Sequence, residues 1–149
     1  MRFICDVMLG KLTKYLRMLG FDTIFLKNLD VLETYKNLAD PPLLFTKRTK
    51  TIPYRPSIFI QANEIQTQMK EIKEVIRPYI DHSAFMTRCI ECNSFIESVE
   101  SKDIEAHVPE YIYHHHKEFK MCPSCKKVYW EGTHTEQMKK WIEGLTSLK

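Results

Sequence analysis

The chain has 149 residues, of which 44% are hydrophobic and 28% are charged, and its formal net charge is +3. This length supports one ordinary hydrophobic core, or one core with a small appended module that needs a further source of stability. No stretch is long and apolar enough to cross a bilayer, and the N-terminus lacks the apolar centre of a signal peptide. We therefore expect a soluble, cytoplasmic protein without a membrane partner.

The first twenty residues predict a strand, an acid and an amphipathic helix in succession. Residues 3–5 are apolar and partly β-branched, which is typical of a buried strand, and Asp6 falls where that strand should end. Four leucines then recur at helical spacing, while Lys11, Lys14 and Arg17 share the opposite face. Ligands of open α/β sheets bind outside the carboxyl ends of the strands, so Asp6 is a candidate site residue. The alternative is that Asp6 caps the helix.

The rest of the first half alternates strands with helices. Asp30 and Glu33 have the spacing of a capping box for a helix over residues 30–40, and Asn63 is the expected cap of a helix over residues 63–77. Such alternation favours an α/β fold with a small parallel sheet covered on both faces. The remaining strands are predicted over residues 23–26, 43–46 and 57–60.

The second half has a different pattern, and we expect two domains, 1–84 and 85–149. Short strands are predicted over residues 94–100 and 127–130, and Thr135 marks the start of a C-terminal helix. The chain is thus expected to be a small parallel-sheet α/β domain followed by a β-rich module and a helix.

Four of the five cysteines predict a metal site in that module. They form two Cys-x-x-Cys pairs, each leading into a predicted strand, which suits a closed tetrahedral shell and a structural Zn²⁺ ion. Iron and a redox dithiol are the alternatives. Cys5, inside a predicted strand, is most simply a buried apolar residue. The predicted metal ligands are Cys89, Cys92, Cys122 and Cys125.

Positive charge is concentrated in the first half. Residues 1–84 carry 13 Lys/Arg against 9 Asp/Glu, whereas residues 85–149 carry 9 against 10. A polyanion should therefore meet the first half, although an ordinary solvated surface is the alternative explanation. Three tyrosines are candidates either for stacking on unpaired bases or for core packing, namely Tyr15, Tyr54 and Tyr129.

Three segments, FICDVMLGKLTKYLRMLGFDT, LLFTKR, and RCIECN together with CPSCKKVYWEGTH, resemble the PIN-like RNase domain of the Mut-seven C-terminal family with its fused zinc ribbon. The resemblance implies a PIN-like nuclease domain, RNA as substrate, and phosphodiester hydrolysis with Mg²⁺ or Mn²⁺ bound at Asp6. Asp6 and Asp30 match two acids of the family. A third acid is expected after a strand whose family pattern resembles Leu-Thr-Arg-Asp, but this chain has Arg48 at that position. Asp40 is a candidate replacement.

Three functions remain open on this basis. The first is a metal-dependent ribonuclease that uses Asp6 and Asp30. The second is a catalytically inactive PIN-like protein that binds RNA, and the third is a protein-interaction adaptor that docks a partner through the zinc ribbon. The sequence identifies no protein partner. The predicted RNA-binding residues are Lys11, Lys14, Arg17, Lys47, Arg48 and Lys50.

Overall fold

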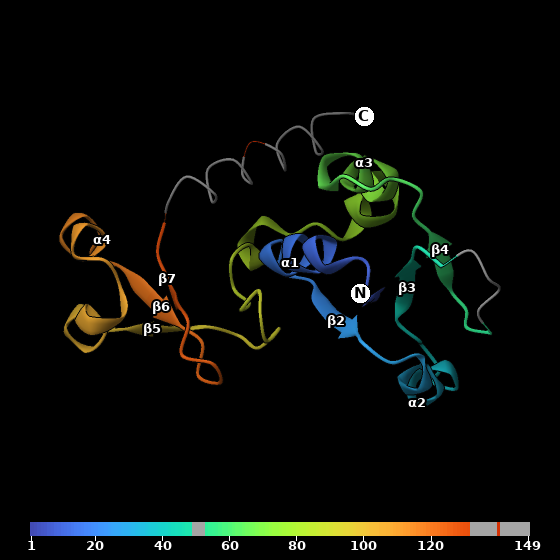
Figure 1. Cartoon of the computed structure of the whole chain (residues 1–149), viewed down its shortest axis with the longest axis horizontal. Helices are drawn as coiled ribbons and strands as arrows, with labels where there is room; N and C mark the ends of the chain where they lie inside the picture. The colour runs from blue at the N-terminus through green and yellow to red at the C-terminus, as the bar shows by residue number, and fades with distance from the viewer. Residues whose placement is uncertain (49–52, 132–139, 141–149) are drawn as a thin grey trace. The chain divides into compact units, whose positions relative to one another are not determined.

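The structure is a computed structural model that describes residues 1–48, 53–131 and 140, and the chain forms two compact units (Figure 1). Unit 1 is Met1–Phe85 and unit 2 is Met86–Lys149. Lys50, and the expected C-terminal helix apart from Lys140, lie outside the described residues. Among the described residues, no helix has both the length and the apolar character needed to span a membrane.

Unit 1 is built on a parallel sheet with the strand order β2-β1-β3-β4. The chain runs from β1 outward to β2 and then crosses back to β3 on the other side of β1, so the strand order reverses between β1 and β3. The strands are β1 (Arg2–Asp6), β2 (Asp22–Leu26), β3 (Leu43–Thr46) and β4 (Ser57–Phe59). This confirms the expected α/β fold.

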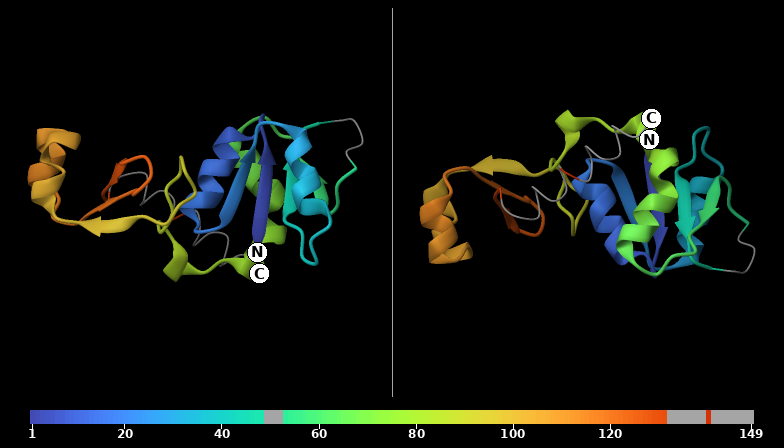
Figure 2. Two further views of the ribbon diagram at one scale, coloured as in Figure 1. Left: turned by 90° about the horizontal axis from the view of Figure 1, so that it is seen from below. Right: turned by 90° about the horizontal axis from the view of Figure 1, so that it is seen from above.

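Helices cover both faces of this sheet. Helices α1 (Gly10–Met18) and α3 (Ile65–Ile76) lie on one face, and η1 (Leu29–Val31) with α2 (Leu32–Lys36) lies on the other (Figure 2). The leucine stripe is fully buried, as its spacing predicts, at Leu12 and Leu16 of α1 and at the N-cap residue Leu9. Short 3-10 turns follow α3 at η2 (Arg77–Tyr79) and η3 (His82–Ala84).

Two helix starts differ from the sequence-based expectation. Asn28 caps η1 by accepting the backbone N–H of Asp30 at 3.0 Å, and α2 ends at Lys36, so the expected capping box of Asp30 and Glu33 is wrong. Asn28, two residues before Asp30 in the sequence, provides the capping oxygen. Asp30 therefore lies inside the 3-10 turn and does not cap a helix. Helix α3 begins at Ile65, so its N-cap residue is Glu64 and not the expected Asn63.

Unit 2 contains a separate antiparallel sheet with the order β5-β6-β7. Its core consists of Ile104, Val108, Phe119 and Val128. Strand β6 was not expected from the sequence. The elements are β5 (Glu97–Val99), η4 (Ser101–Asp103), η5 (Glu105–His107), α4 (Glu110–His115), β6 (Phe119–Met121) and β7 (Val128–Tyr129).

Candidate functional site

Asp6 lies at the carboxyl end of β1, beside β3, at the point where the strand order reverses. Its side chain is only 1% exposed. Oδ1 accepts the backbone N–H of Met8 at 3.1 Å, while Oδ2 accepts the hydroxyl of Thr46 and the backbone N–H of Lys47 at 3.2 Å. Because ligands of open α/β sheets bind at such switch points, this edge is the candidate site of unit 1.

Arg48 shares this site with Asp6. Its Nε atom lies 3.9 Å from Asp6 Oδ2, and its side chain is 40% exposed. The backbone N–H of Arg48 donates to Thr46 Oγ1 at 3.0 Å, so Thr46 bonds both residues. The buried carboxylate is therefore surrounded by N–H and O–H donors, and the exposed charge beside it is a guanidinium.

The side chain of Lys47 points to the loop between β4 and α3. Its Nζ atom donates to the carbonyl oxygens of Ala62 at 2.8 Å, Gln61 at 3.1 Å and Ile60 at 3.5 Å. Glu71 holds the same loop by accepting the backbone N–H groups of Gln61 at 3.0 Å and Ala62 at 2.7 Å. Lys47 thus fastens this loop to the end of β3, and its ammonium group is engaged with the protein itself.

The other acids suggested by the sequence are on the surface. Asp30 and Asp40 are both exposed, and Asp30 lies within η1. In residues 1–48, 53–131 and 140, four cysteines form the single group of three or more His, Cys, Asp or Glu side chains close enough to hold a metal ion. The described part of the chain therefore does not gather Asp6, Asp30 and Asp40 into a carboxylate cluster.

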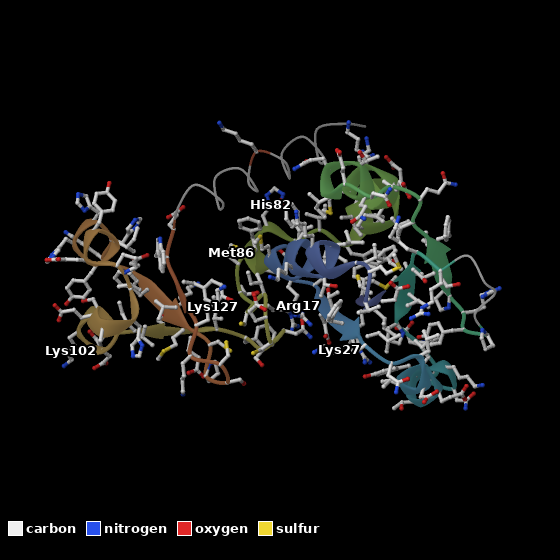
Figure 3. The ribbon with its side chains drawn as sticks, in the orientation of Figure 1. Arg17, Lys27, His82, Met86, Lys102 and Lys127 are labelled. Carbon is white, nitrogen blue, oxygen red and sulfur yellow. The ribbon has the colours of Figure 1, made fainter. Side chains whose placement is uncertain are left out.

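The basic face of α1 is smaller than expected. Lys11 and Lys14 are exposed, but Arg17 is 7% exposed, and its Nε donates to the carbonyl of Thr23 at 3.0 Å (Figure 3). Arg17 lies four residues after the buried Thr13 and so shares the inner flank of the helix. It therefore joins α1 to β2 instead of contributing to the exposed basic face.

Cys89, Cys92, Cys122 and Cys125 offer sulfur atoms that all lie within 4.8 Å of one another. Four thiolates at this spacing fit the tetrahedral shell of Zn²⁺, with no open position for a catalytic water. The sulfur atoms of Cys89 and Cys125 lie 3.7 Å apart. A metal ion held by these four cysteines would have a structural role and would add stability that the small core of unit 2 lacks.

The two halves of this cysteine centre have the same backbone geometry. Cys89 donates its N–H to Ser94 at 2.8 Å, and Cys122 donates in the same way to Lys127 at 2.9 Å. The residue after each second cysteine has a positive φ, 68° at Asn93 and 67° at Lys126. We call these two turns knuckle 1 (residues 89–94) and knuckle 2 (residues 122–127).

Several ionisable groups around these sites are perturbed. A hydrogen bond to Cys125 raises the pKa of Cys92 to about 12. Burial tends to raise the pKa of Cys122, but the backbone N–H groups of Cys125 and Ser124 outweigh it and lower that pKa to about 7. Burial raises the pKa of Cys5 to about 12, in line with its place in the core. Binding of a metal to the cysteines therefore displaces protons.

Two of the three tyrosines considered from the sequence have structural partners. Tyr54 is 2% exposed, and its hydroxyl donates to Pro42 at 2.7 Å. The hydroxyl of Tyr129 donates to Cys89 Sγ at 3.1 Å and accepts the N–H of Ile90 at 3.0 Å. Burial raises the pKa of Tyr129, so its hydroxyl remains a donor to the metal ligand. Tyr54 and Tyr129 therefore support the structure rather than form a stacking surface.

Comparison with known proteins agrees with this architecture. The family model described as Mut7-C RNAse domain matches residues 1–142. No curated protein and no solved structure gives a significant match. The family match covers both the unit 1 site at Asp6 and all four cysteines. Since it spans nearly the whole sequence, the chain belongs to the Mut7-C RNAse domain family.

Proposed function

We propose that this chain is an RNA-binding member of its family that does not hydrolyse RNA with a divalent metal at Asp6. The observation that supports the proposal most strongly is the position of Arg48, 3.9 Å from the Asp6 carboxylate. A cation that approached Oδ2 would have to displace this guanidinium. The residues at this edge therefore do not fit Mg²⁺ or Mn²⁺, which bind through carboxylates in an open array of oxygens.

The hydrogen bonds of Asp6 support the same conclusion. An ionised carboxylate has about four lone-pair positions. Here Met8, Thr46 and Lys47 donate to the two oxygens, and Arg48 lies beside one of them. In this proposal Asp6 ties β1 to β3 and fixes Arg48 in place. Asp6 is then a positioning residue for the guanidinium of Arg48 and has no role as a metal ligand.

RNA remains the proposed ligand because the family is one of RNase domains and unit 1 carries the excess positive charge. Phosphate contacts would come from Arg48 at the sheet edge and from Lys11 and Lys14 on α1, all of which are at least partly exposed. A guanidinium presents a planar array of donors that matches phosphate oxygens. Lys50 is a further candidate, which lies outside the described residues. Arg17 and Lys47 are excluded from this set because their side chains are engaged internally.

A second candidate is the metal-dependent ribonuclease. It is favoured by the family match and by the placement of an acid at the switch point of the sheet. A protein-interaction adaptor, the third possibility, would bind no RNA.

The experiment that separates these functions measures binding and cleavage together. Zinc-loaded protein is mixed with labelled single-stranded RNA, with and without Mn²⁺, across a salt series. The proposal predicts salt-dependent binding and intact RNA, with Arg48→Ala reducing the slope of log affinity against log salt by about 0.7 for the lost phosphate contact. Cleavage that requires Mn²⁺ and is abolished by Asp6→Asn would support the ribonuclease. Absence of binding at low salt would support the adaptor.

A further inference from the structure

Knuckle 1 continues into a short hairpin that exposes an aromatic side chain. Phe95 is 61% exposed and pairs with Arg88 in an antiparallel bridge. The guanidinium carbon of Arg88 lies 4.2 Å from the centroid of the Phe95 ring, and Arg88 Nη1 donates to the carbonyl of Asn93 at 2.9 Å. The ring and the cation thus form one stacked pair on the surface of unit 2.

The equivalent position in knuckle 2 is filled in a different way. Arg88 and Phe95 immediately flank knuckle 1, just as Met121 and Val128 flank knuckle 2, and each pair faces across an antiparallel ladder. Val128 is 9% exposed and belongs to the core of unit 2, with Met121 packed against that core. With the same backbone geometry, the position after knuckle 2 holds a buried valine, whereas the position after knuckle 1 holds an exposed phenylalanine beside a half-buried arginine.

Packing alone does not account for a phenylalanine at this position. A phenyl ring that remains 61% exposed recovers little of the free energy of burial, and the guanidinium on its face adds only the modest cation–π attraction of an exposed site. Two backbone hydrogen bonds hold this hairpin. The N–H of Cys89 donates to the carbonyl of Ser94 at 2.8 Å, and the N–H of Ile96 donates to the carbonyl of Thr87 at 3.0 Å. A backbone held in this way reduces the conformational entropy that is lost when a ligand stacks on the ring.

We infer that Phe95 and Arg88 form a platform on which an unpaired base of RNA stacks. This inference rests on the proposed function and adds a second contact site, in unit 2, to the basic edge of unit 1. Every base has a π face, so an aromatic platform of this kind is tolerant of sequence. Arg88 contributes cation–π attraction beside the ring.

Charge around the platform suits a phosphate backbone. The hydroxyls of Ser94 and Ser124 lie 3.5 Å apart, so knuckle 2 is directly beside knuckle 1. Knuckle 2 carries Lys126 and Lys127, both exposed, and Lys127 is labelled in Figure 3. Glu91 lies 3.9 Å from Lys127, so the charged side chains of Arg88 and the two knuckles, apart from the cysteines, are three cations and this one carboxylate. Unit 2 as a whole is not basic, so we expect it to contribute to RNA binding by stacking on a base and not by a general attraction of phosphates.

The test compares variants of the full zinc-loaded protein on labelled oligouridine and on a blunt RNA duplex. Phe95→Leu keeps an apolar side chain but removes the π face, and Phe95→Trp restores a ring. Tyr111→Ala is the matched control, because Tyr111 is 67% exposed in the same unit but stacks on His115 at 4.1 Å. Zinc content is measured for each variant to establish that the cysteine centre is intact.

Phe95→Leu should weaken oligouridine binding by about 5- to 150-fold, the range that corresponds to the loss of one base–aromatic stack. Phe95→Trp and Tyr111→Ala should bind as the wild type does, and duplex affinity should not change. The slope of log affinity against log salt should be the same in Phe95→Leu and the wild type, because no phosphate contact is lost.

Three results would count against the inference, in distinguishable ways. Wild-type affinity for oligouridine in Phe95→Leu, with zinc retained, would remove the platform while leaving the proposed function intact. Failure of the wild type to bind any RNA would remove both. An equal loss in Tyr111→Ala would show that the effect is general to unit 2 and would also count against a platform at Phe95.

Discussion

Reversing the charge of Arg48 is the most informative change at the edge of the parallel sheet. In the wild type its Nε lies 3.9 Å from Asp6 Oδ2, and 40% of the side chain is exposed, so solvent screens it strongly. With the dielectric of bulk water, one unit charge about 5 Å from a divalent cation contributes about 1.7 kcal/mol. Arg48→Asp changes that charge by two units, which amounts to about 3 kcal/mol, or about two orders of magnitude in Mn²⁺ affinity.

Calorimetric titration of Mn²⁺ into the zinc-loaded protein measures this gain. Arg48→Met removes one unit of charge and adds no oxygen ligand, so it should gain about half as much free energy as Arg48→Asp. Lys70→Asp is the control, because Lys70 is an exposed residue of α3, on the sheet face opposite α2, and undergoes the same change of charge. RNA affinity should fall in Arg48→Asp as Mn²⁺ affinity rises, since the same guanidinium is proposed to contact phosphate.

The reasoning would be refuted by unchanged Mn²⁺ affinity in Arg48→Asp. That result would mean that Arg48 does not keep cations from Asp6, and the account of this edge would have to be abandoned. An equal gain in Lys70→Asp would instead show a general charge effect.

Three further predictions concern residues away from Arg48. Cys122→Ser should release zinc and unfold unit 2 while unit 1 keeps its helical circular dichroism, because the cysteine centre stabilises only the second core; simultaneous loss of both units would contradict this. Lys47→Met should destabilise unit 1 by about 1–3 kcal/mol in urea unfolding, since three carbonyls lose their donor, with no change in the salt slope of RNA binding. Cys5 should resist a thiol reagent at pH 8 until the protein unfolds, and fast labelling of the folded protein would contradict this. Unit 1 should also lose stability as the pH rises from 9.0 towards about 12, because in that range only the thiol of the unfolded chain ionises.

The sequence predicted the parallel sheet well because its strands are short apolar runs whose burial depends on local composition. Asp6 was predicted at the edge because it follows directly on such a run. Its proximity to Arg48 was only a hypothesis, since the two residues are 42 positions apart in the sequence. The strand order, which brings β1 beside β3, is what places them together.

Other features were beyond what the sequence pattern carries. The sequence grouped Arg17 with Lys11 and Lys14 on the exposed face of α1, but Arg17 shares the flank of the buried Thr13. Its bond to the carbonyl of Thr23 depends on the packing of α1 on β2. The sequence placed Lys47 in a basic cluster. Its ammonium group instead donates to the loop between β4 and α3, and the position of that loop depends on β4 and on Glu71. Phe95 was read as one residue of a predicted strand. Aligning the two Cys-x-x-Cys pairs could have singled out Phe95. The equivalent position after the second pair is the buried Val128, whereas Phe95 is exposed.

Incubation of labelled single-stranded RNA with the zinc-loaded wild-type protein and Mn²⁺ tests the central claim most directly, with binding and RNA length measured in the same samples. The account predicts that the RNA is bound in a salt-dependent manner and recovered at its full length. Cleavage that depends on Mn²⁺ and disappears in Asp6→Asn would contradict it.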